Sequence, residues 1–177
     1  MSEVARPAVV LVGPPGAGKS TVGALLARRL GMEFTDVDEL IVARTGRSIS
    51  DIFTSDGESA FREMEETEVA AALRGVDGVL ALGGGAVLSE RTRAALRGHH
   101  VVFLSVGMAE GVRRTGLSTA RPLLAGVNPR ATFAALLEAR LPLYREVATV
   151  EIPTDRRSDD DVAHDVLAAL GTVGGTR

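Results

Sequence analysis

The 177-residue chain contains no cysteine, no tryptophan, a single tyrosine and a single lysine. Without cysteine it can form neither a disulfide nor a thiolate metal site, and it has no thiol nucleophile. Aromatic residues make up only 3% and the net charge is −3, so the basic surface with stacking rings typical of nucleic-acid binding is absent overall. No apolar run approaches the ~20 residues that cross a bilayer, and the N-terminal segment lacks a signal-peptide pattern. We therefore expect a cytoplasmic protein that binds neither nucleic acid nor membrane.

The one lysine, Lys19, lies in a segment, 13–20, that matches the G-x-x-x-x-G-K-[ST] pattern of a phosphate-binding loop. An apolar run precedes this segment and a stretch with helical spacing follows it, as such loops require. The other basic residues are all arginine. A compact ammonium fits a tight ring of backbone N–H groups around a triphosphate better than a planar guanidinium does. The pattern predicts a nucleoside triphosphate site, with the Ser20 hydroxyl on Mg²⁺, formed by Gly16, Ala17, Gly18, Lys19, Ser20 and Thr21.

Strand-like apolar segments alternate with segments of helical spacing, which predicts an α/β fold with a parallel sheet. Five strands are expected, at 8–12, 32–36, 79–82, 101–106 and 148–152. Helices are expected at 19–30, 38–45, 48–54, 58–74, 89–97, 109–115, 130–146 and 159–170. The length fits a single domain. Within it we expect a core over 8–170, a mobile lid at about 114–127 and a frayed tail at 171–177.

Two acidic residues, Asp36 and Asp38, follow the second expected strand. In a doubly wound sheet this strand end lies at the same edge as the phosphate-binding loop, so both carboxylates can face the ligand. The strands at 79–82 and 101–106 do not end in a carboxylate, and the guanine-reading motif of GTPases is missing. These observations favour Asp36 near the Mg²⁺ water shell and Asp38 near the acceptor hydroxyl. A purely structural interpretation, as N-cap and first-turn acids of a helix, stays open.

Several other residues have both a structural and a functional interpretation. Arg62 has glutamates at i−4 and i+4, as in a surface ion-pair network, and Arg140 fits an exposed helix face equally well. The three glycines at 83–85 form either a sharp turn or a backbone that a ligand can approach closely. The segment 111–137 contains four arginines and no acidic residue, which fits a solvated loop or an anion-facing one. Composition does not decide between these interpretations.

Together the motifs resemble the shikimate kinase family, of the kind found in actinobacteria. A phosphate-binding loop alone indicates only a very large superfamily, whereas the ordered set is specific and covers about residues 8–170. It comprises that loop, Asp36-Val37-Asp38, Thr45-Gly46-Arg47-Ser48-Ile49, Phe61-Arg62-x-x-Glu65, Leu82-Gly83-Gly84-Gly85, Arg121-Pro122-Leu123-Leu124 and Arg140-x-x-x-Tyr144. The resemblance implies ATP-dependent phosphorylation of the 3-hydroxyl of shikimate, on the pathway to chorismate and aromatic amino acids. It also implies a nucleoside monophosphate kinase fold, with a five-stranded parallel sheet flanked by helices and a small lid.

The resemblance further implies a role for individual residues, and a monomer is expected. Asp38, Lys19 and Arg121 would be catalytic, with Arg121 supplied by the lid. Mg²⁺ would be held by Ser20 and, through water, by Asp36. ATP would contact the phosphate-binding loop, Arg114, Arg121 and Arg157. Shikimate would be bound, beside a helical region at about 37–75, by Asp38, Arg62, Arg140 and the backbone of Gly83, Gly84 and Gly85.

Two alternative functions stay open. The nearer one is another small-molecule kinase on the same scaffold, acting on gluconate or a nucleoside monophosphate. A nucleotide acceptor needs a second base pocket, whereas Asp38, Arg62 and Arg140 suit a small hydroxylated acid. The other alternative is a nucleotide-binding module without catalysis, and the presence of Lys19 and Arg121 beside Asp38 argues against it.

Overall fold

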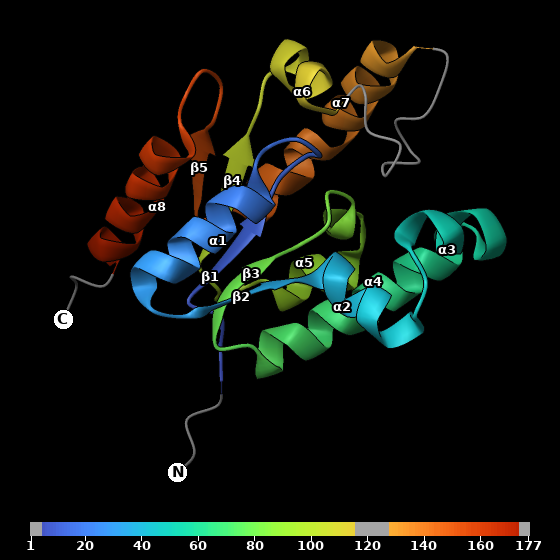
Figure 1. Cartoon of the computed structure of the whole chain (residues 1–177), viewed down its shortest axis with the longest axis horizontal. Coiled ribbons are helices and arrows are strands. Elements are labelled where there is room, and N and C mark those ends of the chain that lie inside the picture. Colours follow the sequence, from blue (N-terminus) through green and yellow to red (C-terminus); the bar gives the residue numbers. More distant parts are fainter. Residues whose placement is uncertain (1–4, 116–127, 174–177) are drawn as a thin grey trace.

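The computed structural model describes residues 5–115 and 128–173 (Figure 1). In this part of the chain, five strands form one parallel sheet in the order β2-β3-β1-β4-β5. The strands are β1 (Val9–Val12), β2 (Glu33–Asp36), β3 (Gly78–Ala81), β4 (Val101–Ser105) and β5 (Val150–Pro153). The helices are α1 (Lys19–Leu30), α2 (Val37–Thr45), α3 (Ile49–Asp56), α4 (Glu58–Gly75), the 3₁₀ helix η1 (Ala86–Leu88), α5 (Glu90–Ala95), α6 (Met108–Thr115), α7 (Pro129–Val147) and α8 (Asp159–Val173).

Helices cover both faces of the sheet, so the fold has three layers (Figure 1). Successive residues of a strand point to opposite faces of the sheet. Because helices cover both faces, β1 at the centre is apolar throughout. Val9 and Leu11 pack in a core shared with α1 and α8. Val10 and Val12 pack in a second core, shared with α2, α4 and α7. The centre of the sheet is therefore buried on both sides.

The α/β fold with a five-stranded parallel sheet, as predicted from the sequence, is confirmed. The frayed tail expected at 171–177 stays a prediction: residues 171–173 form the end of α8, and residues 174–177 lie outside the described residues. The lid predicted at about 114–127 begins inside α6, and the rest of it also lies outside them. Across 5–115 and 128–173, no helix combines the length and the hydropathy that a bilayer span requires.

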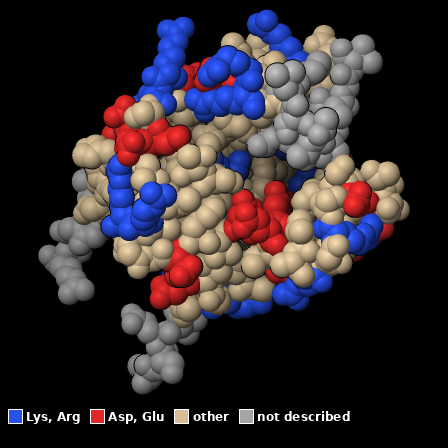
Figure 2. Space-filling view, in the orientation of Figure 1, with Lys and Arg blue, Asp and Glu red and all other residues tan. Residues whose placement is uncertain are grey.

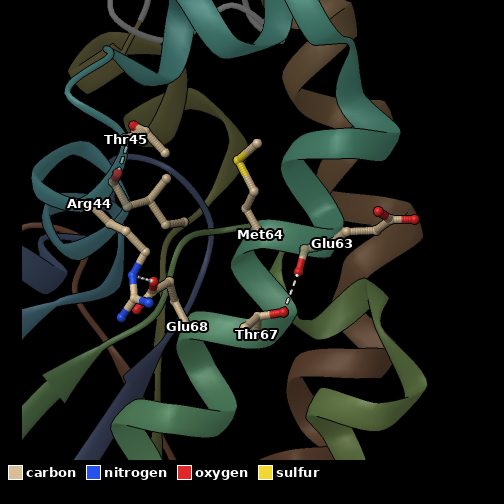
Figure 3. A pocket seen from close by; sticks show the side chains of 7 residues that line it. Arg44, Thr45, Glu63, Met64, Thr67 and Glu68 are labelled. Atoms are coloured by element: carbon tan, nitrogen blue, oxygen red, sulfur yellow. Dashed lines mark hydrogen bonds and ion pairs between the residues drawn. The ribbon is translucent and has the colours of Figure 1, made fainter.

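An ion pair joins α2 to α4 in the region at 37–75 (Figure 3). Arg44 of α2 forms an ion pair with Glu68 of α4, and Glu68 is only 5% exposed. Both lie at a pocket of about 270 Å³ that Met64 also lines. A buried carboxylate that loses its cation is strongly destabilising, so the pair fixes the two helices against each other.

Candidate active site

A cleft of about 380 Å³ lies at the carboxyl edge of the sheet, where β1, β2 and β3 end. Parallel strands place their carboxyl ends at one edge, which is where ligands bind in folds of this class. Figure 2 shows this face hollowed, with acidic side chains on one rim and basic side chains visible inside. The cleft is lined by Gly16, Gly18, Lys19, Ser20, Thr21, Asp36, Asp38, Ile49, Leu82, Gly83 and Gly84.

The phosphate-binding loop has the geometry of an anion site. Gly16 and Gly18 adopt positive φ angles of 81° and 90°, a conformation that other residues rarely take. Gly18 is the N-cap of α1 and has no side chain that could accept from the first N–H groups of the helix. These groups are therefore available to an anion at the positive end of the helix dipole. The Nζ atom of Lys19 donates to the carbonyl oxygens of Gly13, at 2.6 Å, and Pro14, at 3.0 Å.

Asp36 joins this loop to the start of α2. It is the N-cap of α2, and its Oδ1 atom accepts from the Asp38 backbone N–H at 2.8 Å. Its Oδ2 atom accepts from the Ser20 hydroxyl at 3.2 Å. One carboxylate oxygen of Asp36 therefore caps α2, and the other faces the phosphate-binding loop.

The residues present fit Mg²⁺. Ser20 and Asp36 supply hard oxygen atoms that meet in the cleft. The described residues contain no group of three or more metal-binding side chains of the His, Cys, Asp or Glu type. Such a sparse protein ligand set suits Mg²⁺, which keeps several waters and is held largely by substrate phosphates.

Asp38 presents an unsatisfied carboxylate oxygen. Its Oδ1 atom is buried and has no hydrogen-bond partner within the described part of the chain. Burial, followed by the charges of Asp36 and Glu65, raises the pKa of Asp38 to about 6, against the lowering effect of Lys19 and Arg62. A buried polar atom without a partner costs free energy. The oxygen is therefore available to a donor from a ligand.

Glu65 is a site residue that the role assignments from the sequence missed. It is 2% exposed on α4, and its Oε2 atom is also buried without a partner among the described residues. A Cβ atom built at Gly83 would lie 2.7 Å from this Oε2 atom and 3.0 Å from Oδ1 of Asp38. Two unpartnered carboxylate oxygens therefore converge at Gly83. The sequence signal was its place three residues after Arg62 in the family motif.

Arg62 is held by side chains of its own region. Its Nη1 atom donates to Oε1 of Glu65 at 2.8 Å, and Glu58 lies 3.4 Å from the guanidinium. The rings of Phe53 and Phe61 lie 5.9 Å and 5.3 Å from its Cζ atom. The glutamates at i−4 and i+4 suggested a surface network, but the shortest contact of Arg62 is with a buried acid at i+3, Glu65. The guanidinium also lies so close to Gly85 that a side chain there would collide with it.

Arg140, on α7, is only 3% exposed, so the interpretation as a helix-surface residue is wrong. Its charge acts on Glu65: burial raises the pKa of Glu65, whereas Arg62 and then Arg140 lower it. The charges of the arginines of α4 and α7 therefore both act on one buried carboxylate, and Arg62 lies against Gly85 of the glycine turn at 83–85. This arrangement can hold a small anionic ligand.

On the other side of the phosphate-binding loop lies Arg114, predicted to contact the nucleotide. Its Nη1 atom donates to the Gly16 carbonyl at 3.0 Å, and its Nη2 atom to the Thr154 carbonyl at 3.2 Å. Arg157 donates to the Pro153 carbonyl at 3.2 Å and lies 2.6 Å from the carboxylate of Asp165, on α8. The structure thus brings Arg114 to the loop, whereas Arg157 braces the segment after β5. Arg121 lies outside the described residues.

Comparisons with known proteins point to one family. The family model for shikimate kinase matches residues 15–171. A shikimate kinase of Saccharopolyspora erythraea is 71% identical over 149 residues, which cover 84% of this chain and 85% of the relative. That of Mycobacterium tuberculosis is 55% identical over 164 residues, 93% of each chain.

A solved structure of shikimate kinase from Acinetobacter baumannii, in complex with shikimate, superimposes with a TM-score of 0.93. It is 38% identical to this chain, and the match covers 97% of this chain and 96% of the other. A gluconokinase from Sinorhizobium meliloti, at 19% identity and a TM-score of 0.59, shares the fold alone. Because the family model matches residues 15–171 and the two relatives are 71% and 55% identical, the chain belongs to the shikimate kinase family.

Proposed function

We propose that the cleft transfers the γ-phosphoryl group of ATP to the 3-hydroxyl of shikimate, with Mg²⁺ as the metal ion. The observation that carries this proposal is the meeting of Arg62 and Arg140 with two unpartnered carboxylate oxygens at the glycine turn. Cations suit the carboxylate of a small acid, and free carboxylate oxygens suit its hydroxyls. The relative from Acinetobacter baumannii, which holds shikimate, supports the choice of acceptor.

On the nucleotide side, the backbone N–H groups of Gly16, Ala17, Gly18 and Thr21 and the ammonium of Lys19 hold the phosphates. Bound through Ser20 and a water on Asp36, Mg²⁺ would neutralise charge on the β- and γ-phosphates. Phosphoryl transfer passes through a loose transition state, for which catalysis is mainly positioning and charge stabilisation. Lys19 supplies the fixed charge at the donor end of this reaction.

On the acceptor side, Arg62, Arg140 and the backbone at Gly83, Gly84 and Gly85 bind the carboxylate. The fork of a guanidinium matches the planar geometry of a carboxylate. Asp38 accepts a hydrogen bond from the attacking hydroxyl and orients it toward the phosphoryl group. The raised pKa of Asp38, about 6, brings it near the range in which a carboxylate can also take up the proton.

Three further expectations stay predictions. Arg121 is expected to place its charge on the transferring phosphoryl group, Arg114 and Arg157 to contact the nucleotide, and the protein to act as a monomer in the cytoplasm. The hydrogen bond from Arg114 to the Gly16 carbonyl supports the expectation for Arg114.

The test is a coupled assay of ADP formation with shikimate, gluconate and AMP as acceptors. We expect turnover with shikimate alone, and a product whose phosphate is on the 3-hydroxyl, as read by ³¹P and ¹H NMR. Turnover with gluconate or AMP but not shikimate would assign the chain to another kinase activity. ATP binding without product from any acceptor would indicate a nucleotide-binding module.

A further inference from the structure

The hydroxyl of Tyr144 is a buried group that none of the roles above uses. Tyr144 lies on α7, is fully buried, and donates a hydrogen bond of 2.5 Å to the carbonyl oxygen of Gly84. Its ring stacks on Phe103 of β4, with centroids 4.9 Å apart and planes at 23°. Packing therefore holds the ring in one orientation, with the hydroxyl at the glycine turn.

Toward Gly84, Tyr144 can act only as a donor, because the Gly84 carbonyl has no proton to give and the hydroxyl must keep its own. Burial raises the pKa of Tyr144 to about 12, although the charge of Arg140 and a hydrogen bond that Arg140 donates to the hydroxyl oxygen lower it. The hydrogen bond to Gly84 is therefore present across the pH range in which most enzymes work.

The Gly84 carbonyl is the one carbonyl of the turn that a side chain holds. The carbonyl of Gly83 accepts from the Ala86 N–H at 3.1 Å, and that of Gly85 accepts from the Leu88 N–H at 3.1 Å. Both of these bonds are backbone contacts of η1. The orientation of the Gly84 peptide instead depends on Tyr144, which comes from a different element of the fold.

This hydrogen bond also sets the direction of a donor. The Gly84 carbonyl and the Gly85 N–H belong to one trans peptide, whose C=O and N–H groups point in opposite directions. A carbonyl anchored at Tyr144 therefore directs the Gly85 N–H to the side away from Tyr144. Gly85 is also the residue that lies against the Arg62 guanidinium, so this peptide and the cation are neighbours.

Arg140 lies one helical turn before Tyr144, on the same face of α7. We propose that Tyr144 is a positioning residue for carboxylate recognition: its hydroxyl orients the Gly84–Gly85 peptide so that the Gly85 N–H meets the acceptor carboxylate together with Arg62 and Arg140. One helix thus supplies a cation for the carboxylate and fixes the backbone donor beside it. The inference rests on the proposed function and adds a residue to the same site.

The test is Tyr144→Phe, which removes the hydroxyl and keeps the stacked ring. We expect the KM for shikimate to rise about tenfold, the size of effect that one buried hydrogen bond gives. The kcat and the KM for ATP should change less than about twofold. With a shikimate analogue that carries hydrogen in place of the carboxylate, the parent and the variant should differ less than about twofold.

Phe103→Leu is the matched control, because it disturbs the packing of the same ring and keeps the hydroxyl. It should lower the melting temperature and, because a loosened ring still carries its hydroxyl, raise the KM for shikimate less than Tyr144→Phe does. If Tyr144→Phe raises both KM values equally, leaves both unchanged, or weakens the decarboxylated analogue as much as shikimate, the positioning role is overturned.

A measurement without turnover separates this inference from the proposed function. Amide hydrogen exchange at Gly85 in the ligand-free protein should be several-fold faster in Tyr144→Phe than in the parent, since the peptide loses its anchor. Unchanged exchange would overturn the positioning role even in an active enzyme. A parent protein that does not phosphorylate shikimate would instead overturn the proposed function.

Discussion

The nucleotide side and the acceptor side of the cleft hold their positive charges in different ways. Lys19 and Arg114 donate to backbone carbonyls, those of Gly13 and Gly16 among them. Arg62 is instead held by the side chains of Glu58 and Glu65 and by two aromatic rings. The nucleotide side thus depends largely on the path of the main chain, although Arg114 also pairs with Glu110, whereas the acceptor side depends on packed side chains.

The acidic residues of the two sides also differ, in the direction in which their pKa values are shifted. On the acceptor side, burial raises the pKa of Asp38 to about 6 and also raises that of Glu65. On the nucleotide side, hydrogen bonds from Arg113 and then Arg114 lower the pKa of the half-buried Glu110 to about 2. The acceptor side therefore holds carboxylates that lack full compensation and are ready for a ligand, whereas the acid of the nucleotide side is already neutralised by its partners.

The largest expected effect on this contrast is that of Asp38→Asn on turnover. We expect kcat to fall about 10³-fold, within the range for loss of a positioned acid–base group, while the affinity for ATP stays within about threefold. Rapid-quench kinetics and calorimetric ATP titration measure the two quantities. Glu39→Gln, an exposed neighbour on α2, is the control. Activity within a few-fold of the parent would mean that Asp38 does not orient the attacking hydroxyl.

The same substitution should stabilise the ligand-free protein. The pKa of Asp38 rises from 3.8 to about 6 on folding, so the folded state binds the extra proton between these values and stability falls as pH rises through them. Above pH 6 the full cost, about 3 kcal/mol, is present, and below pH 4 it is absent. Asp38→Asn should therefore raise the melting temperature at pH 8 and lose this advantage near pH 4. Scans in EDTA test this, and parallel pH profiles would contradict it.

Lys19→Arg tests the nucleotide side with the charge preserved. The ammonium lies 2.6 Å and 3.0 Å from two carbonyl oxygens, a space that a planar guanidinium cannot share without moving the loop. We expect kcat/KM to fall about 10²-fold, as for a displacement of about 1 Å at a reacting group. Lys19→Met is the comparison variant. If the arginine variant keeps most of the activity, the shape of the cation is not important.

Arg62→Ala tests the acceptor side and has the smallest expected effect. Loss of a charge-assisted contact to the carboxylate should raise the KM for shikimate about 30-fold and leave the KM for ATP within about twofold. Arg74→Ala, an exposed arginine on the same helix, is the matched control and should change neither value. Equal changes in both KM values would mean that the two sides of the cleft are not separate.

The contrast also explains how much the sequence could predict. The fold and the phosphate-binding loop follow from local patterns, since alternation of strands and helices and the spacing of Gly13, Gly18 and Lys19 are visible in the sequence. Asp36 and Asp38 could be placed because parallel strands end at one edge. These features depend on the main chain, and local sequence determines its path.

The acceptor side could not be derived in this way. Arg62 and Arg140 fit exposed helix faces by spacing, and only family resemblance favoured their role. The burial of Arg140 depends on how α7 packs against the rest of the fold. The two arginines are brought to Glu65 by α4 and α7, and these helices lie far apart in the sequence. For the same reason, the hydrogen bond from Tyr144 to Gly84 has no local signal, as 60 residues separate its partners.

The two oxygens of Asp36, one on the Asp38 N–H and one on the Ser20 hydroxyl, have a consequence for variation at this position. A capping side chain must be short to reach back to its own helix, so a glutamate would keep the charge and lose the cap. An asparagine would keep the cap and lose the charge. Position 36 therefore ties the start of α2 to the phosphate-binding loop, and a substitution there should change the spacing between phosphoryl donor and acceptor instead of the affinity for either alone.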